Sequence, residues 1–206
     1  MLFLYAVTFS FAYITLNTGT GALILFAAVQ LTMIFIPVFR GERLHLFEWC
    51  GVIIAFVGFV FLVLPGVSAP SFTGFILMTI AGVAWGIYSL IGRGSKNPLA
   101  DTTFNFIRTI PLVLFLMLLA FYQINWSMQG IILAVLSGAL ASGVGYTIWY
   151  MALRGLSATQ AAIVQLLVPV IAAVGGILFL FEAVTLRLII SAMMILSGVT
   201  VVLIKR

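Results

Sequence analysis

The chain has 206 residues, of which 65% are hydrophobic and 6% are charged; its net charge is +5 and its mean hydropathy is +1.35. Soluble domains carry roughly 25% charged residues, so this chain has too few charges to cover a surface that faces water. The composition excludes a soluble enzyme, a nucleic-acid-binding protein and a disordered chain, and it predicts a polytopic membrane protein. The single cysteine, Cys50, excludes an internal disulfide and a multi-cysteine metal site.

Polar, glycine, proline and charged breaks divide the chain into eight apolar segments. A spanning helix needs about 20 apolar residues, and a backbone that faces lipid must form its hydrogen bonds within a helix or a closed barrel. The alternating pattern of a barrel is absent, so we expect an all-α bundle of about eight transmembrane helices. In chain order the expected helices cover residues 2–16, 20–39, 46–64, 72–92, 103–122, 129–152, 158–180 and 185–204.

The first segment, residues 2–16, is short. It gives about 22 Å of helix, whereas the hydrocarbon core is about 30 Å thick. It has no basic region before its apolar residues and no small-residue cleavage site, which argues against a signal peptide. We expect this helix to begin upstream of Met1.

Basic residues gather on one side of the eight-helix topology, which is the side of the links near 40–45, 93–101 and 153–157 and of the C-terminus. The seven basic residues on that side are Arg40, Arg43, Arg93, Lys96, Arg154, Lys205 and Arg206. The opposite side carries only Arg187. Because cytoplasmic loops are enriched in Lys and Arg, we expect both termini inside the cell (N-in/C-in) and a multi-pass protein of the inner or plasma membrane.

The two ends of the chain carry similar features in the same order. The matched pairs are Tyr13 and Tyr150, Gln30 and Gln165, Glu42 and Glu182, Leu46 and Leu186, and Gly58 and Gly198. Identity between the two stretches is near chance. However, the two glutamates fall on opposite sides of the membrane in the expected topology. The order and the opposite directions therefore predict an inverted-topology repeat, a plan that secondary transporters use to build a substrate site between the copies.

Two blocks of the sequence resemble the drug/metabolite transporter superfamily, the EamA-type permeases. They are FRGERLHLFEWCGVIIAFVGFVFLV at 39–63 and QLLVPVIAAVGGILFLFEAVTLRLIISAMMILSGVTVVL at 165–203. The resemblance implies two inverted five-helix repeats. Residues 1–66 would hold the last three helices of a first repeat, and residues 71–206 a complete second repeat, so that helices one and two of ten are missing from this chain.

The same resemblance implies a secondary transporter, a permease or exporter that moves a small organic metabolite or drug-like solute by alternating access. The alternative is a truncated, non-transporting membrane protein that acts as a partner subunit. We expect no enzymatic activity, cofactor or metal, because one histidine and one cysteine supply no ligand set and no catalytic pair. Expected partners are membrane lipids and a small-molecule substrate, with a homodimer as one open arrangement, and no nucleic acid.

Arg108 is the only basic residue inside an expected span, about 10 Å deep in the fifth segment. Asp101, Asn105 and Arg108 are spaced i, i+4, i+7 and so share one helical stripe. They would form a polar vestibule for anionic or zwitterionic solutes, or the arginine would reach the cytoplasmic headgroups. Both interpretations stay open.

Gln30 and Gln165 lie near the middle of equivalent helices, where they would line the cavity or bond between helices. Pro37 and Pro169 would bend or interrupt the same helices. Aromatic residues on the fourth and sixth segments would line a pocket, or face lipid or the core. The residues predicted to line the pathway are Gln30, Gln165, Trp85, Tyr88, Asn105, Arg108, Tyr146, Trp149 and Tyr150.

Glu42 and Glu182 end corresponding helices and precede tight turns, so together with Pro169 we interpret them as structural residues. A proton-coupling role for Glu182 is the alternative. Small residues of the sixth segment, among them Gly138, Gly143 and Gly145, would permit close approach of a neighbouring helix.

Overall fold

The computed structural model describes residues 1–64, 70–121, 127–180 and 185–204, and these residues form helices and turns without a β-strand. Six helices are long and apolar enough to cross a membrane. They are α2 (Thr18–Phe39), α3 (Leu46–Val63), α4 (Phe72–Gly92), α5 (Pro98–Leu119), α10 (Leu186–Ile204) and the continuous helix Met128–Leu153. The prediction of an all-α membrane protein is confirmed.

The remaining helices are shorter or divided. α1 covers Leu2–Ala12, and the seventh expected segment consists of α8 (Ala158–Val164) and α9 (Leu167–Leu180). Met128–Leu153 consists of α6 (Met128–Val135), a π-helical stretch η3 (Leu136–Val144) and α7 (Gly145–Leu153). Each of the eight expected segments therefore corresponds to a helix or a divided helix.

Two expected boundaries were wrong. α1 ends at Ala12, four residues early, because the backbone N–H groups of Ile14 and Thr15 bond three residues back and form a turn. α5 begins at Pro98 instead of residue 103. The side chain of Asn97 accepts a hydrogen bond from the backbone N–H of Ala100 at 3.2 Å, and Pro98 occupies the first helical position, where its missing N–H costs nothing.

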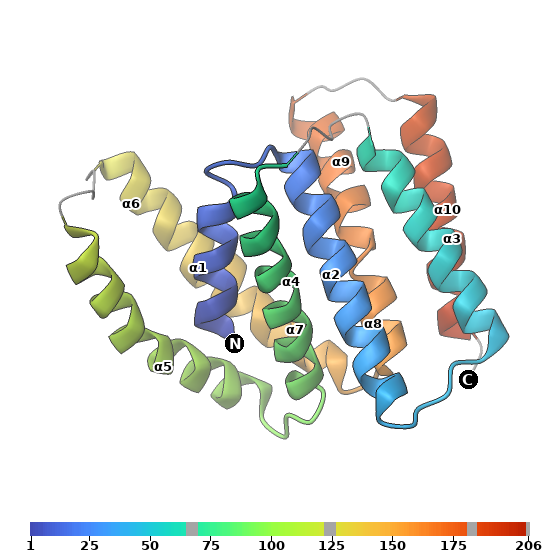
Figure 1. Cartoon of the computed structure of the whole chain (residues 1–206), viewed down its shortest axis with the longest axis horizontal. Helices are drawn as coiled ribbons and strands as arrows, with labels where there is room; N and C mark the ends of the chain where they lie inside the picture. Colours follow the sequence, from blue (N-terminus) through green and yellow to red (C-terminus); the bar gives the residue numbers. More distant parts are fainter. Residues whose placement is uncertain (65–69, 122–126, 181–184, 205–206) are drawn as a thin grey trace.

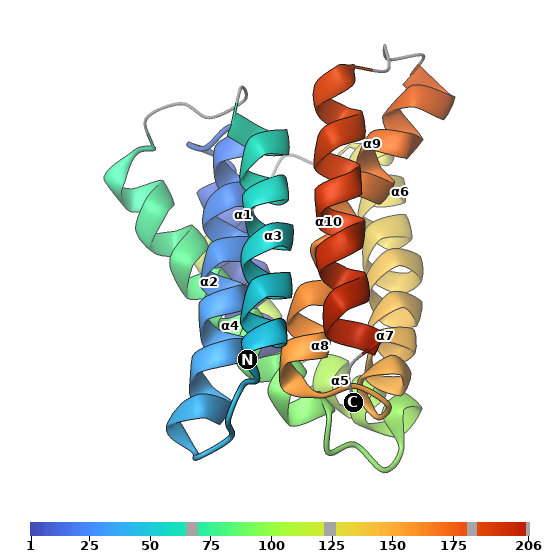
Figure 2. The same ribbon diagram turned by 90° about the vertical axis from the view of Figure 1, so that its right-hand side faces the viewer.

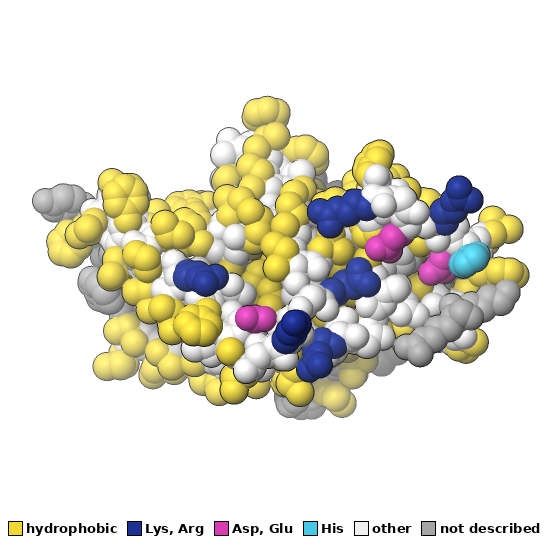
Figure 3. All heavy atoms as spheres, turned by 90° about the horizontal axis from the view of Figure 1, so that it is seen from below, with side chains coloured by type: hydrophobic (Ala, Val, Ile, Leu, Met, Phe, Trp, Pro, Cys, Tyr) yellow, Lys and Arg dark blue, Asp and Glu magenta, His cyan; other side chains and the backbone are white. Residues whose placement is uncertain are grey.

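The helices run between two ends of the molecule (Figure 1). The links after α2, α4 and α7 lie at the lower end, the end predicted to be cytoplasmic (Figure 1). Viewed from below, this end carries Lys and Arg together with acidic side chains, among broad hydrophobic surfaces (Figure 3). α10, which carries Arg187 in its first turn, begins at the opposite end (Figure 2). The described links thus follow the predicted segregation of charge.

The α3–α10 pair is the most extensive helix contact in the described structure (Figure 2). Its backbones approach so closely that a Cβ atom at Gly198 would lie 2.5 Å from the carbonyl oxygen of Gly51 and 2.7 Å from the nitrogen of Ala55. Only glycine fits at this crossing, as in other small-residue interfaces between membrane helices.

The α3–α10 contact is reciprocal. A Cβ atom at Gly58 would lie 3.2 Å from both the carbonyl oxygen of Ser191 and the nitrogen of Ile195. Adding 140 to a residue number of α3 gives its counterpart in α10, by the same offset that matches Glu42 with Glu182: Gly51 corresponds to Ser191, Ala55 to Ile195 and Gly58 to Gly198. The contact of Gly198 with Gly51 and Ala55 is therefore the counterpart of the contact of Gly58 with Ser191 and Ile195. A contact that repeats in this way is the signature of a twofold relation between two similar elements.

The buried core lies where α1, α2, α4, α7 and α8 meet, and its largest side chains include Met33, Met78, Tyr150 and Ile163. α5 diverges from α6 and is inclined relative to α4 (Figure 1). α6 and η3 bury no residue, and their apolar side chains lie on the surface.

Candidate functional site

A partly open pocket of about 550 Å³, the central cavity, lies between α1 and α2 on one side and α4, η3–α7 and α8–α9 on the other; Val168 and Ile171 in its lining are 51% and 66% exposed. Apolar side chains of α2 and α9 form part of its wall. Its aromatic and amide lining residues are Tyr5, Trp85, Tyr146, Trp149 and Gln165. No charged side chain is among the described residues that line it.

Aromatic rings form a continuous layer along the cavity. The ring centroid of Trp85 is 4.9 Å from those of both Tyr5 and Tyr146, and 5.5 Å from that of Tyr88, onto which it stacks. The indole nitrogen of Trp149 donates a hydrogen bond to the hydroxyl of Ser89 at 3.0 Å. The faces of such rings attract apolar and aromatic solutes, and their hydrogen-bonding groups fix the orientation of each ring.

Gln165 connects the aromatic layer to α2 and to its own helix. Its Oε1 accepts a hydrogen bond from the indole Nε1 of Trp85 at 2.6 Å. Its Nε2 lies 3.1 Å from the sulfur of Met33 and 3.2 Å from the carbonyl oxygen of Ala161, to which it donates. One amide side chain therefore links α2, α4 and α8, so its position depends on the arrangement of all three helices.

The helix containing Gln165 is discontinuous at the cavity. The backbone N–H of Leu166 bonds to Ile163 at 3.0 Å, so the carbonyl oxygen of Ala162 loses its helical partner. The side-chain Nε2 of Gln30, from α2, donates to that oxygen at 2.7 Å. Polar side chains commonly compensate broken membrane helices in this way, and such breaks recur at transporter binding sites.

Pro169 lies just beyond this break, inside α9. Because proline has no N–H, Gln165 cannot form the usual helical bond to residue 169, and its carbonyl oxygen accepts from Val168 at 3.1 Å instead. The interruption expected near Pro169 is therefore present at residues 165–166. α2, in contrast, continues through Pro37 to Phe39.

A second, polar pocket of about 330 Å³ lies at the predicted cytoplasmic end. Asp101, Asn105 and Arg108 of α5 line one wall, and Ser95 and Tyr150 lie opposite. The hydroxyl of Ser95 donates to Oδ2 of Asp101 at 2.6 Å and so connects the link after α4 to α5. The stripe predicted from the i, i+4, i+7 spacing thus lies in one pocket, which is separate from the central cavity.

Two buried tyrosines stand between the cavity and the polar pocket. Tyr88 is 3% exposed and Tyr150 is 2% exposed, and their ring centroids are 4.8 Å apart. The hydroxyl of Tyr150 donates to the backbone carbonyl of Tyr88 at 3.2 Å, and its ring lies against Gly92. The described structure therefore has a closed aromatic wall between the two spaces.

The structure divides the predicted pathway residues into groups. Trp85, Tyr146, Trp149 and Gln165 line the central cavity, whereas Asn105, Arg108 and Tyr150 line the polar pocket. Tyr88 lies in the wall between them. Gln30 lines neither space and bonds between helices instead.

Comparison with known proteins identifies the family. The sequence profile of the EamA-like transporter family matches residues 72–204. The chain belongs to the EamA-like transporter family. An uncharacterized protein of Pseudomonas aeruginosa is 48% identical over 206 residues, which cover 100% of this chain and 71% of the relative. A protein of Archaeoglobus fulgidus named an uncharacterized transporter is 28% identical over 209 residues, which cover 98% of this chain and 74% of that protein.

A solved crystal structure shares the fold of this EamA-like chain, with a TM-score of 0.77 at 20% sequence identity. The match covers 100% of this chain and 74% of the other. Family membership and the apolar helices together make the protein a multi-pass cell-membrane protein of the transporter class.

Sequence reasoning missed the roles of Tyr5 and Met33 in the EamA-like chain. Tyr5 lines the cavity from α1, and Met33 contacts Gln165 from α2. The spacing of Tyr5, Phe9 and Tyr13 was a usable signal, because aromatic residues four apart form one helical stripe and these three rings do pack in series. Met33 has no comparable signal in an apolar helix.

The glycines of η3–α7 do not pack against a neighbouring helix in the described structure. A Cβ atom at Gly138 or Gly145 would meet nothing within 4 Å, and one at Gly143 would meet only the carbonyl of Gly138. The expectation of close helix packing at these positions was wrong for the described residues. Instead, the glycines coincide with a π-helical stretch, a rare geometry that is frequent at functional sites.

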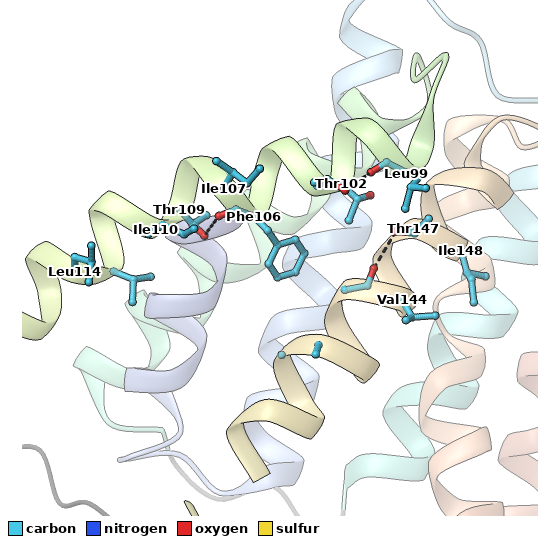
Figure 4. A pocket seen from close by; sticks show the side chains of 15 residues that line it. Leu99, Thr102, Phe106, Ile107, Thr109, Ile110, Leu114, Val144, Thr147 and Ile148 are labelled. Carbon is cyan, nitrogen blue, oxygen red and sulfur yellow. Dashed lines mark hydrogen bonds between the residues drawn. The ribbon is translucent and has the colours of Figure 1, made fainter. Parts of the chain in front are cut away.

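A hollow of about 710 Å³ lies between α5 and η3–α7 and is almost entirely apolar (Figure 4). The threonine hydroxyls at positions 109 and 147 bond to carbonyls of their own helices, which leaves an apolar surface suited to lipid chains (Figure 4).

Glu42 is exposed in the turn after α2, where its N–H bonds to Pro37 at 3.0 Å. Glu182 lies outside the described residues.

Proposed function

We propose that this chain carries a small organic metabolite or drug-like solute across the cell membrane through the central cavity. The observation that carries the proposal is the cavity beside the α8–α9 break, where residues from both predicted repeats meet. Such a position, between inverted copies and next to a discontinuous helix, is where secondary transporters bind their substrates.

The lining favours one kind of solute. Aromatic rings and one amide offer stacking and hydrogen bonds but no formal charge among the described residues. A planar or apolar group of one or two rings fits the volume of about 550 Å³. A charged group on such a solute would have to remain hydrated or lie outside the cavity, because an unpaired buried charge is costly.

Alternating access is the mechanism that the repeat pattern supports. The reciprocal α3–α10 contact agrees with the match of residues 42–64 with 182–204, and so favours two related units of opposite direction. Residues 1–66 and 71–206 would be these units. The Tyr88–Tyr150 wall would close the cavity toward the cytoplasm in one state and open in the other.

Reconstituted flux tests the proposal. Purified protein in proteoliposomes is assayed for uptake of labelled tryptophan, adenine and ethidium, which are planar solutes that are zwitterionic, neutral and cationic, respectively. Saturable uptake of any of them above empty liposomes is expected, with a several-fold loss in Gln165→Leu. The matched control is Gln160→Leu, because Gln160 is an equally buried glutamine of α8 that bonds outside the cavity, to Val202.

The absence of flux for all three solutes, with folded protein in the vesicles, would refute transport of planar solutes by this chain. It would favour the alternative of a non-transporting subunit. Equal flux losses in Gln165→Leu and Gln160→Leu would refute the assignment of the cavity.

A further inference from the structure

The polar pocket at the end of α5 lies apart from the path through the bundle. Arg108 and Asp101 are exposed, whereas Phe106 of the same helix points inward and packs 6.1 Å from the ring of Tyr146. The buried Tyr88–Tyr150 pair separates the pocket from the cavity. The charged stripe of α5 therefore faces the outside of the molecule.

The pocket offers two opposite charges that do not neutralise each other directly. No ion pair joins Arg108 to Asp101 in the described structure, and they lie seven residues apart, or about 10 Å along the helix. Ser95 bonds to one carboxylate oxygen of Asp101 and leaves the other available. Asn105, between the two charges, adds a side-chain amide donor. A ligand that complements this pocket carries an anion at one end and a cation at the other.

The surroundings of the pocket are apolar and face the bilayer. Ile91 is 64% exposed and Phe104 is 56% exposed at its rim. α5 is inclined relative to α4 (Figure 1). The first half of α5 therefore lies closer to the predicted cytoplasmic interface than it would in a helix that runs parallel to α4. A guanidinium at this depth needs an anionic partner, and lipid phosphates are the nearest source.

We propose that this pocket binds the headgroup of phosphatidylethanolamine in the cytoplasmic leaflet. Arg108 and Asn105 hold the phosphate, and Asp101 accepts hydrogen bonds from the primary ammonium. The acyl chains lie against Ile91 and Phe104. Phosphatidylcholine fits less well because its trimethylammonium group has no N–H to donate, and phosphatidylglycerol fits less well because it has no cation for Asp101. The proposal is independent of what the central cavity transports.

Native mass spectrometry tests the proposal directly. The purified full chain is equilibrated with equal amounts of phosphatidylethanolamine, phosphatidylcholine and phosphatidylglycerol that carry identical acyl chains, and retained lipids are counted. The expected result is at least a five-fold preference for phosphatidylethanolamine over phosphatidylcholine. Asp101→Asn should reduce this preference to near one, and Arg108→Gln should lower the retention of all three lipids.

Matched variants separate recognition from structure. Ser95→Ala removes the Ser95–Asp101 hydrogen bond but keeps the carboxylate, so its lipid preference should remain. Arg40→Gln and Glu42→Gln remove exposed charges at the same end, outside the pocket, and should change nothing. Each variant is first checked for a monodisperse size-exclusion peak.

Three results would overturn the proposal. The first is equal retention of ethanolamine and choline lipids by the wild-type chain. The second is an unchanged preference in Asp101→Asn, or the same loss in Ser95→Ala. The third is displacement of the lipid by an equal concentration of glycerophosphoethanolamine, since a headgroup without chains that competes so well would make the pocket a site for soluble zwitterions.

Discussion

Gly198→Ala tests the packing that joins the two predicted repeats. The added methyl group would lie 2.5 Å from the carbonyl oxygen of Gly51 and 2.7 Å from the nitrogen of Ala55. Both are backbone atoms, so no side-chain rotation relieves the contact. Because atoms pack best at about 3.5–4.0 Å, α3 and α10 would have to separate locally by about 1 Å.

Two opposing effects determine how much Gly198→Ala changes the free energy of unfolding. Overpacking usually costs about 1–3 kcal/mol, and two contacts this short with backbone atoms place the cost in the upper part of that range, at about 2–3 kcal/mol. The higher helix propensity of alanine relative to glycine stabilises a helix interior by about 1 kcal/mol. We therefore expect Gly198→Ala to lower the free energy of unfolding by about 1–2 kcal/mol. Gly138→Ala is the control, because its Cβ would meet nothing within 4 Å, and it should be neutral or stabilise by up to about 1 kcal/mol.

Equilibrium unfolding in mixed dodecylmaltoside and sodium dodecyl sulfate micelles, followed by tryptophan fluorescence, measures both variants. The two should differ in sign or by at least about 1 kcal/mol. If Gly198→Ala unfolds at the same detergent fraction as the wild type, or later, the helices are not held at the described separation and the argument fails.

Three further predictions follow from single contacts. Gln30→Leu removes the donor to the Ala162 carbonyl and should cost about 1 kcal/mol in the same unfolding assay; no loss would mean that the helix break needs no side-chain partner. Trp85→Phe keeps an aromatic ring but loses the hydrogen bond to the amide of Gln165, so proteoliposome flux should fall several-fold while stability changes little. Unchanged flux would contradict a role of this hydrogen bond in positioning the ring of Trp85. Arg43→Cys in a Cys50→Ser background should react with an impermeant maleimide only in inside-out vesicles, whereas reaction in right-side-out vesicles would reverse the predicted orientation.

The helices and their order were predictable because each one depends on a long apolar run and a clear break. The start of α5 was not, since residues 98–102 (PLADT) continue no clear apolar run, and the helix start depends on the Asn97 cap and on Pro98. The same limit applies to α1, where the apolar pattern continues through a turn that only backbone geometry reveals. Hydropathy therefore finds helices but not the capping that ends them.

The candidate site was predictable in its residue types and not in its grouping. The spacing of Asp101, Asn105 and Arg108 placed them on one stripe, and the structure adds that the stripe faces away from the cavity. Which side of α5 faces the bundle depends on Phe106 and on the inclination of the helix. Neither is determined by the sequence of α5 alone, because the face that packs is selected by the neighbouring helices.

The two glutamines show how a repeat can diverge in function while its framework persists. Gln30 and Gln165 are equivalent in the matched sequences, yet one fills the gap in the other's helix: Gln30 bonds to the carbonyl freed by the break next to Gln165. α2 has no equivalent break for Gln165 to compensate, and Gln165 bonds instead to Trp85 at the cavity wall. Only one of the two helices is broken, so only one glutamine is needed to repair it. The asymmetry of the break thus explains why the second copy contributes the cavity residue and the first copy holds it in place.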